Sequence, residues 1–250
     1  MLLAGALSLA AGWAQAVDWT GEVALGVLST SGNSQTFSAN GKLSLDFLQQ
    51  QWWKRFEATA LSVSESGVET TERYTITGQL SRNLTDRDYL YGVLDYERDL
   101  FGGVRRRLSA TLGYGRRVVL RPDFQLDGEI GAGNRKAEAQ VTRDRSNEAV
   151  LRGRVRYLWD FSETGSFEQS LIIESGASNR RTELLSELEL LVVGNVSLVL
   201  SVTIRNNTDV APGTEHTDTF TALNVAYRFS GGEPMRVPTV PAGDWRRNTR

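Results

Sequence analysis

The 250-residue chain contains no cysteine, one histidine and five prolines. The lack of cysteine excludes a disulfide framework, thiol catalysis and a cysteine-ligated metal site. After residue 16 no apolar run reaches the roughly 18 residues that a membrane-spanning helix needs. The net charge of -2 provides no strongly basic surface, so nucleic acid is not an expected partner.

Glycine is frequent, with 24 residues, which together with scarce proline favours many strands joined by tight turns. The length fits one large all-β domain as well as two small ones. The 40% hydrophobic content suits a soluble protein. It equally suits a barrel that faces lipid on one side and a polar lumen on the other. Composition therefore leaves both classes open, and the pattern along the chain has to decide.

Residues 1–16 carry no charge and end on Ala14-Gln15-Ala16, the small-x-small pattern that signal peptidases cut. We therefore predict that residues 1–16 are a signal peptide and that the mature chain starts at Val17. A membrane anchor is the alternative, but the apolar segment is too short for one.

Residues 219–229 show a pattern that recurs along the chain. Leu223, Val225, Tyr227 and Phe229 share one face of an extended strand, and smaller or polar residues occupy the other. Soluble strands average about five or six residues, whereas a tilted membrane strand needs about nine to eleven. The same alternation predicts strands at residues 18–28, 34–48, 52–63, 73–84, 89–100, 108–120, 124–138, 148–161, 167–178, 183–193, 196–206 and 219–229.

These segments predict an all-β fold, a single antiparallel transmembrane β-barrel of about twelve strands over residues 17–229. Connections after even-numbered strands are short, whereas those after odd-numbered strands include long ones at 64–72, 139–147 and 207–217. Such barrels have short periplasmic turns and longer extracellular loops. Residues 230–250 contain several glycines and prolines and are predicted to form a flexible tail.

Aromatic side chains gather near the strand ends on the short-turn side. Tryptophan and tyrosine prefer the headgroup level of a membrane, so this position predicts a periplasmic aromatic girdle. Aromatics that fill a sandwich core are the alternative, but they would lie at strand middles. The predicted girdle consists of Trp19, Trp52, Trp53, Tyr89, Trp159, Phe167, Tyr227 and Phe229.

Charged residues on the polar faces of the strands predict a charge ladder in the lumen. Opposed rows of charge across a narrow lumen would set ion selectivity. Alternatively, charges on neighbouring strands pair with one another and stabilise the sheet. The two roles are not distinguished by alternation alone. The predicted ladder consists of Arg152, Arg154, Arg156, Asp127, Glu129, Asp95, Glu97, Asp99, Glu187 and Glu189.

A hydrolase at the outer rim would need His216, the one histidine, as general base beside Glu215 and Asp218. A lone histidine in a polar loop is usually just solvated, so we expect no enzyme, no cofactor and no metal site. A secreted soluble β-protein is the other alternative. In the loop at 139–147, Arg143 and Arg145 are candidates to meet lipid phosphates.

The chain resembles the salt-induced outer-membrane protein family, domain of unknown function 481. The resemblance lies in Trp19-Thr-Gly-Glu-Val-Ala-Leu-Gly26, the turn Thr30-Ser-Gly-Asn33 with the strand to Leu48, Trp53, and the terminal Tyr227-Arg-Phe229. It implies an outer-membrane barrel with no established activity. The expected function is a narrow charge-lined channel or a structural envelope component. The expected partners are outer-membrane lipid, lipopolysaccharide and the barrel-assembly machinery.

Overall fold

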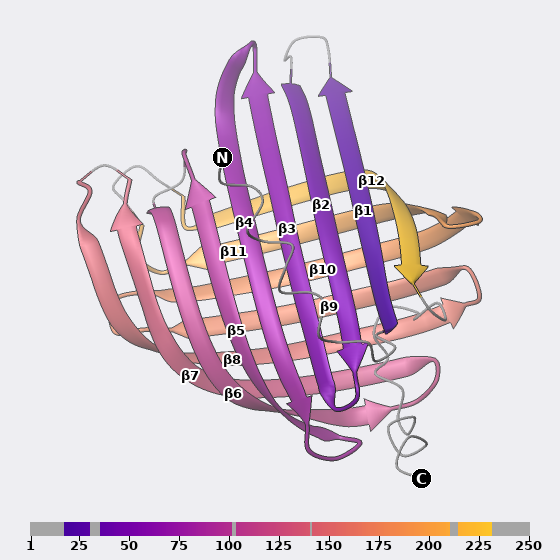
Figure 1. Cartoon of the computed structure of the whole chain (residues 1–250). Coiled ribbons are helices and arrows are strands. Elements are labelled where there is room, and N and C mark those ends of the chain that lie inside the picture. Colours follow the sequence, from indigo (N-terminus) through magenta and orange to yellow (C-terminus); the bar gives the residue numbers. More distant parts are fainter. Residues whose placement is uncertain (1–17, 31–35, 102–103, 141, 211–214, 232–250) are drawn as a thin grey trace, which may run out of the picture.

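A computed structural model of the chain describes residues 18–30, 36–101, 104–140, 142–210 and 215–231. Twelve antiparallel strands close into a barrel, as the alternation predicts (Figure 1). The strands are β1 (Asp18–Thr30), β2 (Thr36–Gln49), β3 (Trp52–Glu65), β4 (Val68–Asn83), β5 (Asp88–Asp99), β6 (Val104–Leu120), β7 (Phe124–Ala139), β8 (Arg145–Ser162), β9 (Gly165–Ser175), β10 (Arg180–Val193), β11 (Val196–Asn207) and β12 (Thr217–Gly231).

The predicted signal peptide lies outside the described residues, as does most of the predicted tail. The strand β12 continues two residues past Phe229, because Ser230 and Gly231 pair with Thr20 and Trp19 on β1. Within the described ranges, no helix is long and apolar enough to cross a membrane.

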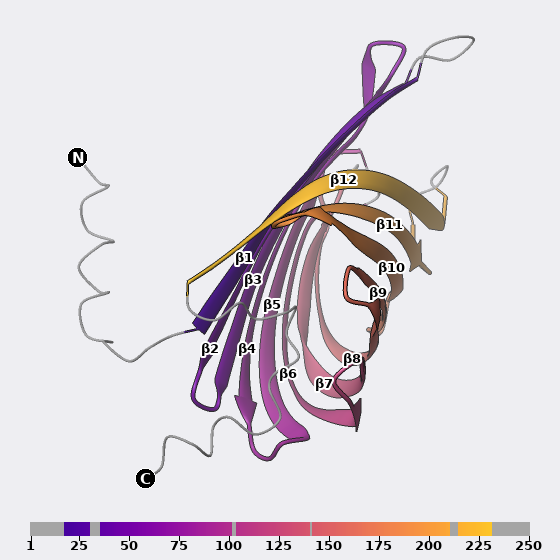
Figure 2. The ribbon, with the colours of Figure 1, turned by 90° about the vertical axis from the view of Figure 1, so that its right-hand side faces the viewer.

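Each strand pairs with its neighbours in sequence, and β1 pairs with β12 to close the barrel. This closing seam runs only from Trp19↔Gly231 to Leu25↔Val225, whereas β1 pairs with β2 along its whole length. Figure 2 shows β1 and β12 diverging beyond the paired stretch. Two side-chain hydrogen bonds bridge the seam, one from Arg228 to Glu22 at 3.1 Å and one from Asn40 to Asn224 at 2.6 Å.

The two faces of the sheet have opposite chemistry. Outward-facing Leu112, Ile130 and Leu151 are 74%, 68% and 66% exposed, while inward-facing Arg152 and Glu174 are buried. Removing one such large apolar side chain from water stabilises by roughly 1.5–3 kcal/mol. An outer surface built from these side chains is therefore stable only against an apolar medium, and a membrane supplies one.

The connections on the short-turn side match the prediction, with two to four residues each, whereas one predicted long loop is wrong. Residues 64–72 form a tight hairpin in which Ser66 and Gly67 turn with φ of 51° and 81°. Two consecutive positive φ values fit the twist of the flanking strands. The polar residues on both sides of this turn continue β3 and β4. Because they do not alternate with apolar residues, the sequence pattern did not predict them as parts of strands. The predicted loop 139–147 is also shorter, since β8 starts at Arg145.

Candidate functional site: the charged lumen

The arginines of β8 project into the barrel and pair with carboxylates on both neighbouring strands. Register places Arg154 opposite Glu129 and Arg156 opposite Asp127. Glu129 lies 3.2 Å from Arg152 and 3.7 Å from Arg154. On the other side, Arg156 donates two hydrogen bonds of 2.7 Å to Glu168. The predicted ladder residues Arg152, Arg154 and Arg156 thus lie inside the barrel, and carboxylates on the neighbouring strands neutralise their charges.

The predicted ladder residues of β5, Asp95, Glu97 and Asp99, also face inward. Asp95 accepts a hydrogen bond of 2.8 Å from the hydroxyl of Thr77, and Asp99 accepts one of 2.7 Å from Nε of Arg73. Between them, Glu97 accepts a hydrogen bond from Arg107 on β6.

Glu97 is also the point where opposite walls of the barrel meet. Its carboxylate lies 3.4 Å from Arg181 on β10 and 3.9 Å from Arg205 on β11, strands on the far side of the ring. Arg73 contributes a fourth guanidinium at 3.6 Å. Glu183 lies between the two far arginines, 2.7 Å from Arg181 and 2.6 Å from Arg205. These ion pairs narrow the lumen toward the outer rim.

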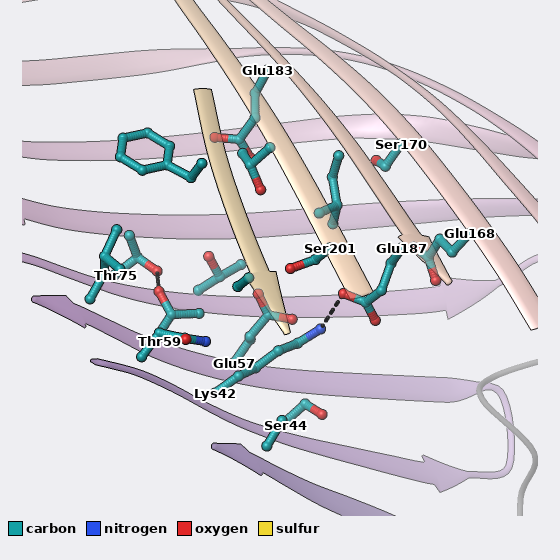
Figure 3. A pocket seen from close by; sticks show the side chains of 18 of the residues that line it. Lys42, Ser44, Glu57, Thr59, Thr75, Glu168, Ser170, Glu183, Glu187 and Ser201 are labelled. Carbon is teal, nitrogen blue, oxygen red and sulfur yellow. Dashed lines mark hydrogen bonds and ion pairs between the residues drawn. The ribbon is translucent and has the colours of Figure 1, made fainter. Parts of the chain in front are cut away.

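A second contact crosses the lumen below this point. Nζ of Lys42 on β2 lies 3.3 Å from Glu187 on β10, with Glu57 close to the same amine (Figure 3). Glu189, one step further along β10, accepts a 2.8 Å hydrogen bond from Arg228. The predicted ladder members Glu187 and Glu189 therefore face the lumen, and each has a basic partner.

A cavity of 530 Å³ runs along the inner wall beside these residues. Its lining spans nearly the whole height of the barrel, for example from Ser38 to Asp46 on β2 and from Thr219 to Arg228 on β12. Nine basic and nine acidic side chains line it, so its formal charge balances. The basic ones are Lys42, Arg55, Arg73, Arg107, Arg152, Arg154, Arg181, Arg205 and Arg228. The acidic ones are Glu22, Asp46, Glu57, Asp95, Glu97, Glu168, Glu183, Glu187 and Glu189.

Toward the short turns, the inner face of β5 to β7 is covered by the rings of Tyr89 and Tyr91. A Cβ atom on inward-facing Gly115 would lie 2.2 Å from the ring of Tyr89, and one on Gly113 would lie 2.7 Å from the ring of Tyr91. The rings therefore pack directly onto backbone that carries no side chain. The lining of the 530 Å³ cavity includes Val93, Asp95 and Glu97, further along β5, but neither of these two tyrosines.

Two members of the predicted girdle are wrong, because they lie inside the barrel. Tyr89 donates a hydrogen bond of 2.9 Å to Glu129, and Nε1 of Trp53 donates one of 2.9 Å to Asp46. Each of these two residues lies an even number of positions from an inward-facing charged residue on its strand, so it faces inward as well. Its position near the strand end does not change the face on which it lies. Each buried ring gains a carboxylate partner for its polar group.

The other six predicted girdle residues face outward near the short turns. Trp19 packs edge-on against Phe229 with ring centroids 5.9 Å apart, and Tyr227 stacks on Phe229 at 6.4 Å. Trp159 contacts Phe161 at 5.6 Å. The outward-facing set is Trp19, Trp52, Trp159, Phe167, Tyr227 and Phe229.

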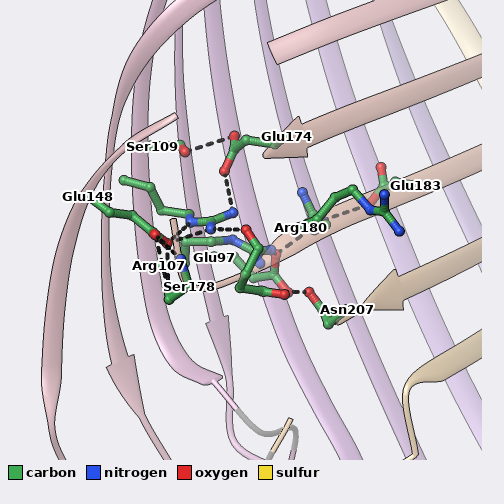
Figure 4. A network of polar contacts seen from close by, with 12 residues as sticks. Glu97, Arg107, Ser109, Glu148, Glu174, Ser178, Arg180, Glu183 and Asn207 are labelled. Atoms are coloured by element: carbon green, nitrogen blue, oxygen red, sulfur yellow. Dashed lines mark hydrogen bonds and ion pairs between the residues drawn. The ribbon is translucent and has the colours of Figure 1, made fainter. Parts of the chain in front are cut away.

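At the outer rim, the short loop 176–179 is tied to β8. Glu148 accepts hydrogen bonds from the backbone N–H of Ser178 at 2.8 Å and from Arg135 at 2.6 Å (Figure 4). Arg135 also donates to Glu174 at 2.9 Å. Partial burial opposes ionisation of Glu148, but these donors hold the pKa of its carboxyl below the usual range.

His216 lies at the outer end of the barrel with its Nδ1 2.9 Å from the backbone oxygen of Asn207. Its side chain is exposed. Among the described residues, no group of three or more histidine, aspartate or glutamate side chains is arranged to hold a metal ion.

Sequence reasoning missed the residues that cross the lumen, namely Arg73, Arg181, Arg205 and Lys42. Alternation shows that they face inward, since Arg205 has the parity of Ser201 and Lys42 that of Ser44. Their meeting with Glu97 and Glu187 depends on which strands lie opposite in the closed ring. No spacing in the sequence contains that information.

Comparison with solved structures gives the same fold. The NanC porin is 13% identical with a TM-score of 0.51, and the match covers 85% of this chain and 98% of that one. The COG4313 outer membrane channel from Pseudomonas putida F1 is also 13% identical, with a TM-score of 0.52 and coverage of 87% and 96%. The chain thus has the barrel architecture of outer-membrane channels.

At the level of sequence, the chain is 28% identical over 212 residues to the uncharacterized protein YdiY of Escherichia coli (strain K12). The match covers 83% of this chain and 82% of that protein. The model of the family described as "Protein of unknown function, DUF481" matches residues 23–229, nearly the entire barrel. This chain is therefore a member of the DUF481 family, as the residue patterns predicted.

Proposed function

We propose that this protein is an outer-membrane channel that conducts small ionic solutes through its lumen. The observation that carries this proposal is the 530 Å³ cavity, whose lining extends over nearly the full height of the barrel and is dense in charge. A purely structural barrel has no need of this space, since its interior can be closed by side chains, as it is beside Tyr89 and Tyr91.

Both signs of charge line the cavity along its length. In the outer half, Arg73, Arg107, Arg181 and Arg205 surround Glu97. Glu183 and Asp99 pair with three of these four arginines. Toward the short turns, the carboxylates of Glu22, Asp46, Glu57, Glu168 and Glu189 outnumber the guanidinium groups of Arg55, Arg154 and Arg228. The inner half therefore favours cations, and selectivity at the outer narrowing depends on how its four arginines are paired.

The test is the reversal potential of the refolded barrel in a planar bilayer under a salt gradient. The Arg181→Gln and Arg205→Gln double variant removes two positive charges from the outer narrowing while Glu97 keeps Arg107 and Arg73. Its reversal potential should move toward cation selectivity, because two carboxylates lose a neutralising partner. The variant Lys42→Met removes the lower crossing contact and should increase the size of the conductance steps.

The matched control changes two arginines on the outer surface, Arg82→Gln and Arg116→Gln, and should leave the reversal potential unchanged. Every variant is first checked for heat-modifiable migration on a gel, which reports a folded barrel. A folded wild type that gives no discrete steps would contradict the channel and leave a structural envelope role. Steps whose selectivity ignores the lumen variants would contradict the assigned lining.

Outer-membrane location and assembly by the barrel-assembly machinery belong to the same proposal. They are supported by the apolar outer face and by the terminal strand β12, which presents Tyr227 and Phe229 outward. The protein should fractionate with outer membranes and resist carbonate extraction. A soluble β-protein would be released.

A further inference from the structure

A row of charged residues crosses the outside of the barrel near the long-loop end. Successive strand registers pair Tyr74 with Arg98, Arg98 with Arg106, Arg106 with Glu138, and Glu138 with Arg145. The row thus runs across β4 to β8 on the outward face, perpendicular to the strands. In such a row, like charges directly opposite each other destabilise the sheet, and Arg98 faces Arg106 in this way.

The next row toward the membrane is mostly apolar. It pairs Ile76 with Tyr96, Tyr96 with Leu108, and Leu108 with Lys136. Ile76 and Leu108 are 45% and 41% exposed on the outer surface. The charged row therefore stands at the level where the apolar surface ends, which is the level of lipid headgroups.

A cleft of 320 Å³ lies between these two rows. Tyr96 and Leu108 form apolar parts of its wall, and Arg106, Lys136 and Arg145 contribute the basic parts. Among the residues that the structure describes, these basic groups outnumber the carboxylates that pair with them. Glu138 lies 3.8 Å from Arg143 and 3.5 Å from Arg145, and it is the one carboxylate in the row. Among the described residues, Arg98, Arg106 and Lys136 form no salt bridge.

We propose that this surface binds a phosphorylated glycolipid of the outer leaflet, with its phosphates on the arginine row and an acyl chain along Tyr96 and Leu108. Neighbouring strands lie about 4.8 Å apart, so the backbones of Arg98 and Arg145 are separated by roughly 14 Å. A headgroup with two well-separated phosphates matches this spread better than a headgroup with one. Guanidinium groups suit phosphate because they donate paired hydrogen bonds.

This inference rests on the outward face meeting lipid and on the long-loop end lying outside. It does not require the lumen to conduct, so its failure and that of the channel are separable. A lipid site on β5 to β8 would also neutralise the facing pair Arg98 and Arg106, for which the described part of the chain provides no salt bridge.

The test is native mass spectrometry of the refolded protein in neutral detergent, titrated with bisphosphorylated lipid A. The triple variant Arg98→Gln, Arg106→Gln and Lys136→Gln should bind this lipid roughly 100-fold more weakly, since each cation near a lipid surface contributes about a factor of five. The matched control Lys54→Gln, Arg82→Gln and Arg116→Gln makes the same charge change on the outward face near the short turns. It should bind like the wild type.

Three further probes test the chemistry. Monophosphorylated lipid A should bind more weakly than the bisphosphorylated form, and dephosphorylated lipid A and phosphatidylglycerol more weakly still. Equal binding of the dephosphorylated lipid, or of phosphatidylglycerol, would overturn the proposal. Equal loss in the control triple variant would do the same. The single variant Lys136→Gln, which changes one exposed side chain, keeps the test valid if the triple variant does not fold.

Discussion

Adjacent tryptophans in this barrel face different media. Trp52 is 39% exposed on the outer surface, whereas Trp53 is buried against Asp46 and lies 5.0 Å from the guanidinium carbon of Arg55. The alternation of a strand requires that one of two neighbours faces inward. The prediction that both belong to the girdle ignores this requirement. Arg55 lies two residues after Trp53 on the same strand, and its inward-facing charge was the signal that could have placed Trp53 correctly.

We predict that lipids brominated on their acyl chains quench Trp52 strongly and Trp53 weakly. Bromine quenches on contact, and only Trp52 is within reach of acyl chains if the outer face meets lipid. The measurement uses two single-tryptophan variants of the refolded protein, one retaining Trp52 and the other Trp53, with the remaining tryptophans changed to phenylalanine. Equal quenching of the two would contradict the inward placement of Trp53.

Among the elements, β5 packs against β6 through tyrosine rings that cover glycines. Tyr89 covers Gly115 of β6, and its hydroxyl reaches Glu129 on β7. A side chain at Gly115 would force this ring away and break the hydrogen bond. The packing of β5, β6 and β7 against one another therefore depends on the position of the Tyr89 ring.

We predict that Gly115→Ala lowers the free energy of unfolding by about 1–3 kcal/mol, the usual cost of overpacking. The control is Gly128→Ala on β7, where an added Cβ meets nothing within 4 Å. It should leave stability nearly unchanged. Urea titration with heat-modifiable migration as the readout measures both variants. A Gly115→Ala barrel as stable as the wild type would show that Tyr89 is free to move.

The outer rim carries a pH-dependent contact between elements. Glu148 on β8 lies above Leu151, the last outward-facing leucine of that strand, and holds loop 176–179 through Ser178. Because the pKa of Glu148 is lowered in the folded state, its contribution to stability is complete above the unfolded pKa. That contribution disappears as the pH falls through the folded value.

We therefore predict that wild type and Glu148→Gln differ in unfolding midpoint at neutral pH and converge below about pH 4, near the pKa of an ordinary glutamate. Hydrogen exchange of the amide of Ser178 should accelerate in the variant at neutral pH. The control is Glu163→Gln in the exposed turn between β8 and β9, which should change neither measurement. A difference that persists unchanged to low pH would exclude titration of Glu148 as its cause.

On the scale of the whole molecule, the lumen is only partly filled. Near the short turns, β5 to β7 are covered by the rings of Tyr89 and Tyr91 and by the ion pairs of β8, while the 530 Å³ cavity extends along the other strands and the outer part of β5. Exchanging Arg152, Arg154 and Arg156 for glutamate would thus break wall contacts as well as alter the lumen. Removing one partner of a buried ion pair costs about 3–5 kcal/mol. Arg181 and Arg205 at the outer narrowing are more informative positions for conductance.

The sequence alone determined the number of strands, their facing and the outward apolar surface, because strand alternation is a local property that each segment displays by itself. It also determined that Arg152, Glu97 and Glu187 face inward. Tertiary structure decided which charges meet. Glu97 gathers arginines from β4, β6, β10 and β11 because closure of the ring brings opposite walls together. Whether inward-facing side chains fill the lumen depends on how rings such as that of Tyr89 pack against neighbouring strands. The sequence of a single strand does not contain the distance between such a ring and the next strand.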